Sequence, residues 1–158
     1  MMSKNTNVKK LAISGIVMAM YVVIIFLTQS FAFGQYQIRI ATGLYSLAAI
    51  YPFLILPLGL ANSLSNFLFG GLGPLDVIGG FVAGILTSAC CYWLKKINVL
   101  LVAIPILLIP SLLVPIWLSY LLKVPYGILV LSVGIGQIIP AIAGVLLAGS
   151  LEKPLSKI

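Results

Sequence analysis

The sequence predicts an all-α integral membrane protein with six transmembrane helices in a single domain, residues 1–158. Of its 158 residues, 62% are hydrophobic and only 7% are charged, whereas a soluble domain carries about 25% charged residues. The apolar residues form long runs that are interrupted by prolines, glycines and lysines. Because one helical span needs about 20 residues, six spans use about 120 and leave only short loops.

The first helix is predicted over residues 9–30, after the basic residues Lys4, Lys9 and Lys10. The same run read as a secretory signal would be cleaved near residues 32–34. The apolar region of a signal is about 7–15 residues long, and this run is longer and is followed by further apolar runs. We therefore expect a helix that is retained.

The next apolar block is interrupted by Pro52 and Pro57. A single helix of 30 residues would be about 45 Å long, which exceeds the thickness of one bilayer core. The block therefore predicts two short helices, 40–54 and 56–70, joined by a tight turn.

The last three helices are separated by clear breakers. A segment rich in glycine and proline, 70–74, precedes a fourth helix that Asp76 begins and that covers 76–94. The fifth helix, 98–122, contains three prolines, so we expect it to be kinked or partly unwound. The sixth helix covers 126–151.

The basic residues predict the orientation. An even number of spans places both termini on one side of the membrane. With the N-terminus inside, the inner side carries Lys4, Lys9, Lys10, Lys95, Lys96, Lys153 and Lys157, and the outer side carries Arg39 and Lys123. This excess of inner lysines follows the positive-inside rule and predicts an N-in, C-in topology.

The composition excludes most enzyme classes. Without histidine there is no Ser/His/Asp triad, no Cys/His dyad and no imidazole metal ligand. The two acids, Asp76 and Glu152, are far apart, and the adjacent Cys90 and Cys91 lie in an apolar run, which is typical of helix packing. No P-loop occurs. We therefore expect no enzyme activity, no metal, no cofactor and, because the basic residues end apolar runs, no nucleic-acid binding.

Polar side chains gather near the predicted outer face. Polar groups in lipid are costly and usually face a protein interior or a cavity, and apolar walls with a few hydrogen-bonding groups are typical of small-molecule pockets. The predicted substrate-binding residues are Gln35, Gln37, Arg39, Asn62, Asn66, Asp76, Trp117, Tyr120 and Gln137.

Each of these residues also has a structural interpretation. Asp76 is a good N-cap for the fourth helix, and Arg39 is either an outer-face charge or a partner of Asp76. Intramembrane amides often connect helices, an interpretation that applies to Asn62, Asn66 and Gln137. Aromatic residues at helix ends often form an interfacial belt, an interpretation that applies to Trp117, Tyr120 and Tyr126.

The first helix carries a face of small residues, Ala12, Gly15 and Ala19. Small residues three and four positions apart allow another helix to approach closely. This face serves either packing within the chain or docking onto a separate membrane protein.

Several segments between about residues 8 and 150 together carry a resemblance to a known family. They are Ala19-Met20-Tyr21-Val22-Val23, Phe33-Gly34-Gln35-Tyr36-Gln37-Ile38-Arg39-Ile40, Asn66, Gly73-Pro74-Leu75-Asp76-Val77-Ile78-Gly79-Gly80 and Gly136-Gln137. The chain resembles the compact six-helix bundle of a substrate-binding S component of an energy-coupling-factor (ECF) transporter. Within that group it is most similar to the QueT-type, queuosine-precursor family.

The resemblance implies a division of labour in a prokaryotic plasma membrane, with the chain embedded in membrane lipid. The chain would capture a queuosine precursor (queuine or a 7-deazaguanine such as preQ0 or preQ1) from outside. A separate, EcfT-like transmembrane coupling protein and two cytoplasmic ATPases would supply energy. The small face of the first helix would dock on the coupling protein, the loops 35–39 and 70–74 would close over the ligand, and the subunit would tilt to release it.

Two positions depart from the family pattern, because Thr42 and the Gln137 of Gly136-Gln137 stand where the family commonly has glutamate. A cationic ligand such as an aminomethyl deazaguanine would benefit from a buried acid, whereas a neutral ligand would use amides. Three alternatives stay open: an S component for another vitamin such as cobalamin, a stand-alone channel or exporter, and a membrane assembly protein without a ligand.

Overall fold

The protein is an all-helical membrane protein, as predicted. The computed structural model describes residues 2–155, and no strand occurs in this range. Lys157, which was assigned to the inner side, lies outside the described residues. Five helices in the described range are long and apolar enough to cross a membrane: Thr6–Leu27, Pro52–Gly70, Pro74–Lys95, Val99–Leu122 and Tyr126–Glu152. A sixth, Ile40–Ala49, is apolar but shorter. The N-in, C-in orientation stays a prediction.

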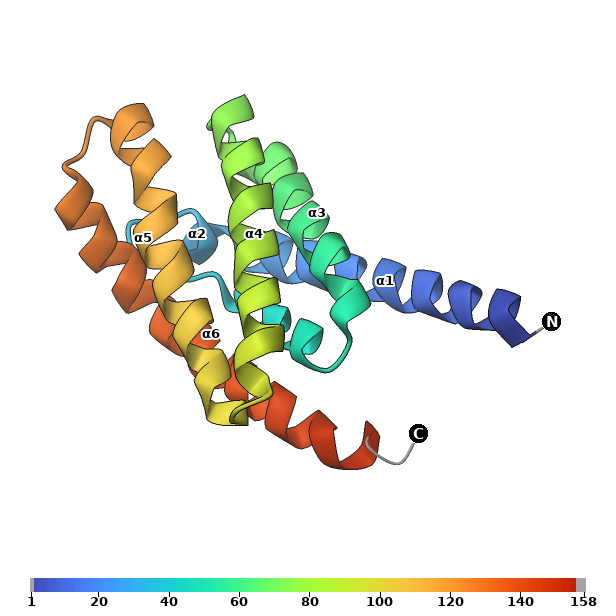
Figure 1. Ribbon diagram of the computed structural model, residues 1–158. Coiled ribbons are helices and arrows are strands. Elements are labelled where there is room, and N and C mark those ends of the chain that lie inside the picture. The colour runs from blue at the N-terminus through green and yellow to red at the C-terminus, as the bar shows by residue number, and fades with distance from the viewer. Residues whose placement is uncertain (1, 156–158) are drawn as a thin grey trace.

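The expected first helix is divided near its end. Helix α1 covers Met2–Leu27 and the single turn α2 covers Gln29–Ala32. Only one side of α1 packs on the bundle, where Tyr21 and Ile25 are fully buried. Figure 1 shows α1 crossing behind α3 at a steep angle, with its N-terminal end reaching away from the other helices.

The expected α-helix over 40–54 is wrong in type, because the segment forms two 3₁₀ helices, η1 (Ile40–Ala49) and η2 (Pro52–Leu54). Pro52 disfavours the helical conformation at the residue before it, and Tyr51 accordingly has φ −120° and ψ 89°. Ten residues of 3₁₀ helix rise about 20 Å, so η1 is shorter than the hydrocarbon core. It is nevertheless largely buried and packs against α4 and α6.

Helix α3 (Ile55–Ser65) continues into the π-helical turn η3 (Asn66–Gly70). The breaker then turns the chain through Gly71 and Gly73, with φ of 67° and 89°, values that glycine adopts readily. Helix α4 covers Pro74–Lys95, and its N-cap residue is Gly73. The interpretation of Asp76 as the N-cap is therefore wrong, since Asp76 lies inside the first turn.

The expected fifth helix begins with the 3₁₀ turn η4 (Val99–Val102), and its α-helical part, α5, covers Ala103–Leu122. Pro110 and Pro115 lie inside α5 without interrupting it. Of the two expected outcomes, partial unwinding is therefore wrong, and a kink stays a prediction. Lys123 ends the helix in a left-handed conformation, and α6 covers Tyr126–Leu155.

The connections between the long helices lie at alternate ends of the molecule. Figure 1 places the α3–α4 and α5–α6 connections at one end of the molecule and the α4–α5 connection at the other. The largest fully buried side chains include Tyr21, Tyr45, Leu54, Leu58 and Ile106. They come from α1, η1, η2, α3 and α5, so the core joins segments that are far apart in the sequence. The loop after α2, residues 33–39, carries the first candidate site residues, Gln35, Gln37 and Arg39.

Candidate functional site

Arg39 lies at the centre of a buried polar cluster. It precedes η1 and is only 7% exposed. Its Nη1 donates a hydrogen bond of 2.9 Å to Oδ1 of Asn62, and its Nη2 donates to Oδ1 of Asn66. The guanidinium carbon lies 4.7 Å from the centroid of the Phe33 ring, a cation–π arrangement. The cation is thus held by neutral groups.

Asn62 and Asn66 also bind the opposite helix. Their i, i+4 spacing places both side chains on one face of the helix. Nδ2 of Asn62 donates to the Gly80 carbonyl at 2.7 Å, and Nδ2 of Asn66 donates to the Asp76 carbonyl at 2.9 Å. Because arginine only donates hydrogen bonds, each amide must present its oxygen to Arg39 and its nitrogen to α4. The two amides therefore join helices and orient Arg39 at once.

Asp76 and Trp117 form a second buried pair. Trp117 Nε1 donates a hydrogen bond of 2.9 Å to Asp76 Oδ1. Trp117 is buried, so its assignment to an interfacial belt is wrong. The indole fits because Gly79 has no side chain, and a Cβ there would lie 2.6 Å from the Trp117 ring.

Arg39 and Asp76 are connected through Asn66, which accepts from the Arg39 side chain and donates to the Asp76 backbone. In the part of the chain that the structure describes, the ion pair is Lys95 Nζ to Glu152 Oε1, at 3.1 Å. The expected Arg39–Asp76 pairing is therefore an indirect link through an amide. Sequence reasoning identified both charges but not the connection between them.

Two buried polar residues that are far apart in the sequence contact each other. Gln137 of α6 is buried, and its Oε1 lies 2.9 Å from Thr42 Oγ1 of η1. The same hydroxyl lies 2.7 Å from the Arg39 carbonyl. The contact between η1 and α6 is therefore a neutral hydrogen-bonded pair next to Arg39.

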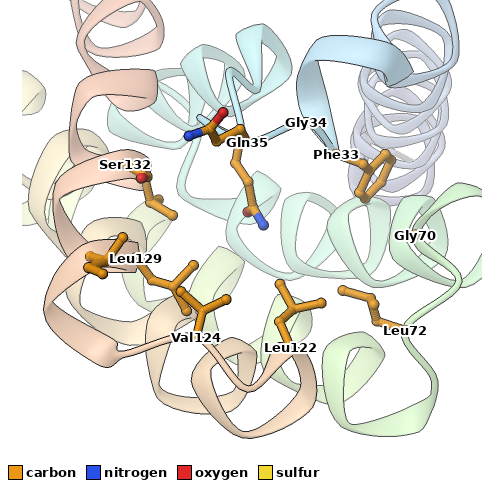
Figure 2. Close-up of a pocket in the computed structure, with 12 residues that line it drawn as sticks. Phe33, Gly34, Gln35, Gly70, Leu72, Leu122, Val124, Leu129 and Ser132 are labelled. Carbon is orange, nitrogen blue, oxygen red and sulfur yellow. The ribbon is translucent and has the colours of Figure 1, made fainter.

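A cavity of about 380 Å³ lies between the loop after α2 and the α5–α6 connection. Figure 2 shows Phe33 and Gln35 facing Leu122 and Val124 across it. The lining residues are Phe33, Gly34, Gln35, Gln37, Gly70, Leu72, Leu122, Val124, Ile128, Leu129, Ser132 and Val133. Small-molecule sites have volumes of about 300–1,000 Å³ and mostly apolar walls, and this cavity fits that description.

The cavity and the buried cluster share a wall. The Phe33 ring lines the cavity and also lies over the Arg39 guanidinium. Gly70 also lines the cavity, and a Cβ on it would lie 3.1 Å from Asp76 Oδ2 and 3.3 Å from Phe33 Cε1. The cluster therefore lies directly behind the cavity wall, where it holds the loop and the α3–α4 turn in position.

The loop rests on α6 at Gly136. A Cβ at Gly136 would overlap the Tyr36 carbonyl oxygen and would lie 3.1 Å from the Gln37 carbonyl carbon. Gln37 has φ 46°, and its N–H bonds to the Gly34 carbonyl at 3.1 Å. The loop is thus a tight turn whose backbone touches the helix that carries Gln137.

A family model described as QueT transporter matches residues 11–153 of the chain. The chain belongs to the QueT transporter family. No curated protein and no solved structure matched it. The family and the five long apolar helices make the protein a multi-pass membrane transporter, with a small molecule as its substrate.

In this QueT family member, two other sets of predicted residues lie apart from the cluster. Tyr120 is 68% exposed, and Lys123 Nζ lies 4.7 Å from its ring, so the structure brings Tyr120 neither to the cluster nor into the cavity lining. Ala12, Gly15 and Ala19 are exposed on α1, and a Cβ at Gly15 would meet no atom within 4 Å. The interpretation that these small residues serve packing within the chain is therefore wrong.

Sequence reasoning missed Phe33 and Ser132 as lining residues and did not assign Thr42 a place in the site. Phe33 was visible only as part of the segment that carries the family resemblance. Ser132 lies in a continuous apolar run of α6, where nothing in the sequence indicates which side of the helix faces the loop. Only the packing of the loop against α6 identifies it.

Proposed function

We propose that this chain is the substrate-binding S component of an ECF-type ABC importer that captures a queuosine precursor from outside the cell. The observation that carries the proposal is the cavity between the loop after α2 and the α5–α6 connection, with amides at its edge and an aromatic wall. Gln35 and Gln37 line it beside Phe33. Carboxamides both donate and accept hydrogen bonds, as the edge of a 7-deazaguanine requires, and an aromatic ring favours stacking with a planar heterocycle.

The size of the cavity favours this substrate class over the alternative vitamin. A corrin ring with its nucleotide loop is several times larger than a purine-like base. A cavity of about 380 Å³ suits the smaller molecule, so queuine, preQ0 and preQ1 are preferred to cobalamin.

The exposed face of α1 supports a role for partner proteins. Ala12, Gly15 and Ala19 present a surface without bulky side chains outside the bundle, and such surfaces allow close contact between membrane helices. The sequence has no P-loop, so ATP hydrolysis would come from other chains. We propose that a transmembrane coupling protein docks on this face and that two cytoplasmic ATPases drive uptake.

The test separates binding from transport. Purified chain should bind a deazaguanine but not cobalamin, and Arg39→Ala should weaken that binding because the amides and the loop lose their common partner. Gly15→Trp should leave binding unchanged and abolish ATP-driven uptake into proteoliposomes that contain the coupling protein and both ATPases. Met20→Trp, at an exposed position of α1 outside the small face, is the matched control and should retain uptake.

Equal loss of binding and uptake in Gly15→Trp would refute docking through this face. Uptake by the chain alone, without ATPases, would favour the channel or exporter. Unchanged affinity in Arg39→Ala would show that the buried cluster does not support the site.

A further inference from the structure

The cavity wall contains no charged side chain among the residues that the structure describes as its lining. Its polar side chains are Gln35, Gln37 and Ser132, and the others are apolar or glycine. A ligand that enters the cavity therefore exchanges water for amides, a hydroxyl, backbone groups and hydrocarbon. Such a site offers hydrogen bonds but no direct counter-ion.

One cation lies close to this wall. The Arg39 guanidinium lies 4.7 Å from the centroid of the Phe33 ring, which lines the cavity. Lys123 is exposed, and its ammonium lies over the exposed Tyr120 ring, apart from the lining. The buried Arg39 guanidinium repels a positively charged ligand at short range, and low-dielectric surroundings strengthen that repulsion.

The nearest carboxylate is buried and is not part of the lining. Asp76 is 5% exposed, and its Oδ2 lies close to Gly70. Its Oδ1 accepts a hydrogen bond from Trp117 Nε1, and its backbone carbonyl accepts one from Asn66, which also binds Arg39. A ligand ammonium in the cavity therefore meets no carboxylate among the lining residues.

The Thr42–Gln137 pair supplies no counter-ion either. Both side chains are buried and neutral, and they form a hydrogen bond of 2.9 Å with each other. Gln137 lies next to Gly136, where the loop touches α6. Neither Thr42 nor Gln137 therefore places a negative charge near the contact between the loop and α6.

We propose that this cavity selects an electrically neutral heterocycle over the corresponding cation. The proposal rests on the proposed function, and among 7-deazaguanines it favours a 7-cyano compound over a 7-aminomethyl compound. The physical reason is that a buried ammonium without a carboxylate loses its hydration and gains only neutral hydrogen bonds.

The experiment compares two ligands that share one ring system. Dissociation constants for 7-cyano- and 7-aminomethyl-7-deazaguanine are measured by calorimetry on the purified chain at neutral pH. The cyano compound should bind at least ~10-fold more tightly than the aminomethyl compound, since an unpaired buried ammonium is strongly disfavoured.

A charge substitution in the lining tests the cause. Gln37→Glu should reverse the preference, so that the aminomethyl compound gains affinity and the cyano compound loses it. Gln35→Glu tests the same reversal from a second lining position if the first variant folds poorly. Gln29→Glu makes the same change at an exposed residue of α2 outside the lining and should leave the preference as in the unmodified chain.

The outcomes are distinguishable. Tighter or equal binding of the aminomethyl compound would overturn the selectivity while leaving the proposed function intact. A folded Gln37→Glu or Gln35→Glu chain with unchanged preference would overturn the assignment of selectivity to this cavity. Absence of binding by both compounds and by queuine would overturn the proposed function itself.

Discussion

Replacement of Gly136 by alanine should displace the loop that forms one side of the cavity. The methyl carbon would lie 2.9 Å from the Tyr36 carbonyl carbon and 3.1 Å from the Gln37 carbonyl carbon. Non-bonded carbon atoms pack at about 3.5–4.0 Å, so the Tyr36 carbonyl carbon alone requires a movement of ~0.6 Å. The methyl would also overlap the Tyr36 carbonyl oxygen, and relief of that overlap requires a larger movement of the loop from α6. Gln35 and Gln37 move with it.

The size of the effect follows from the cost of overpacking. An extra methyl in a filled site costs about 1–3 kcal/mol. If that cost falls on the state in which the loop is seated over the ligand, the dissociation constant rises about 5- to 150-fold. The N–H groups of Gln37 and Ile38, which bond to the Gly34 and Phe31 carbonyls, should also exchange with solvent faster.

The matched control is Gly134→Ala on the same helix. A Cβ there lies 3.6 Å from Ser111 Oγ, an ordinary contact, and the two substitutions raise helix propensity equally. Calorimetry gives the affinities, and hydrogen–deuterium exchange measures loop protection. If Gly136→Ala matches Gly134→Ala in both measurements, the loop does not depend on its seat at Gly136.

Two further predictions concern stability, measured by thermal unfolding in detergent. Trp117→Phe leaves Asp76 Oδ1 buried without its donor, and the free energy of unfolding should fall by about 1–3 kcal/mol, whereas Trp93→Phe at a 62% exposed position should have little effect. Equal stability of the two tryptophan variants would contradict the importance of the indole–carboxylate bond. Glu152→Gln breaks the ion pair with Lys95, but because Glu152 is 46% exposed the loss should stay within ~1 kcal/mol. A larger loss would mean that this pair holds α4 to α6.

Composition and local breakers predicted the fold class and most helix boundaries. The glycine- and proline-rich segment 70–74 separates two helices in the structure as expected, and the predicted helix 76–94 matches α4, Pro74–Lys95. Such features are local, because the apolarity of a run and the backbone restrictions of glycine and proline act within a few residues. The type of helix was less predictable, and η1 is a 3₁₀ helix in which nine of ten residues are buried.

The candidate site was predictable as a set of residues but not as an arrangement. The sequence indicated Arg39, Asn62, Asn66 and Asp76 as neighbours near one face, and the structure joins these four. The same reasoning placed Tyr120 with them, although its side chain is exposed beside Lys123. Trp117 lies three residues earlier on the same helix, but its indole packs against Gly79 and is buried.

By itself, the sequence determined that this chain is a helical membrane protein of the QueT type with few charges, since length, apolarity and motif residues are properties of the chain alone. The tertiary structure alone decided which polar groups meet. Thr42 and Gln137 are 95 positions apart, and the loop that begins at Phe33, whose ring covers Arg39, touches α6 at Gly136. Contacts of this kind depend on helix rotation and close backbone approach, which emerge when distant segments pack together.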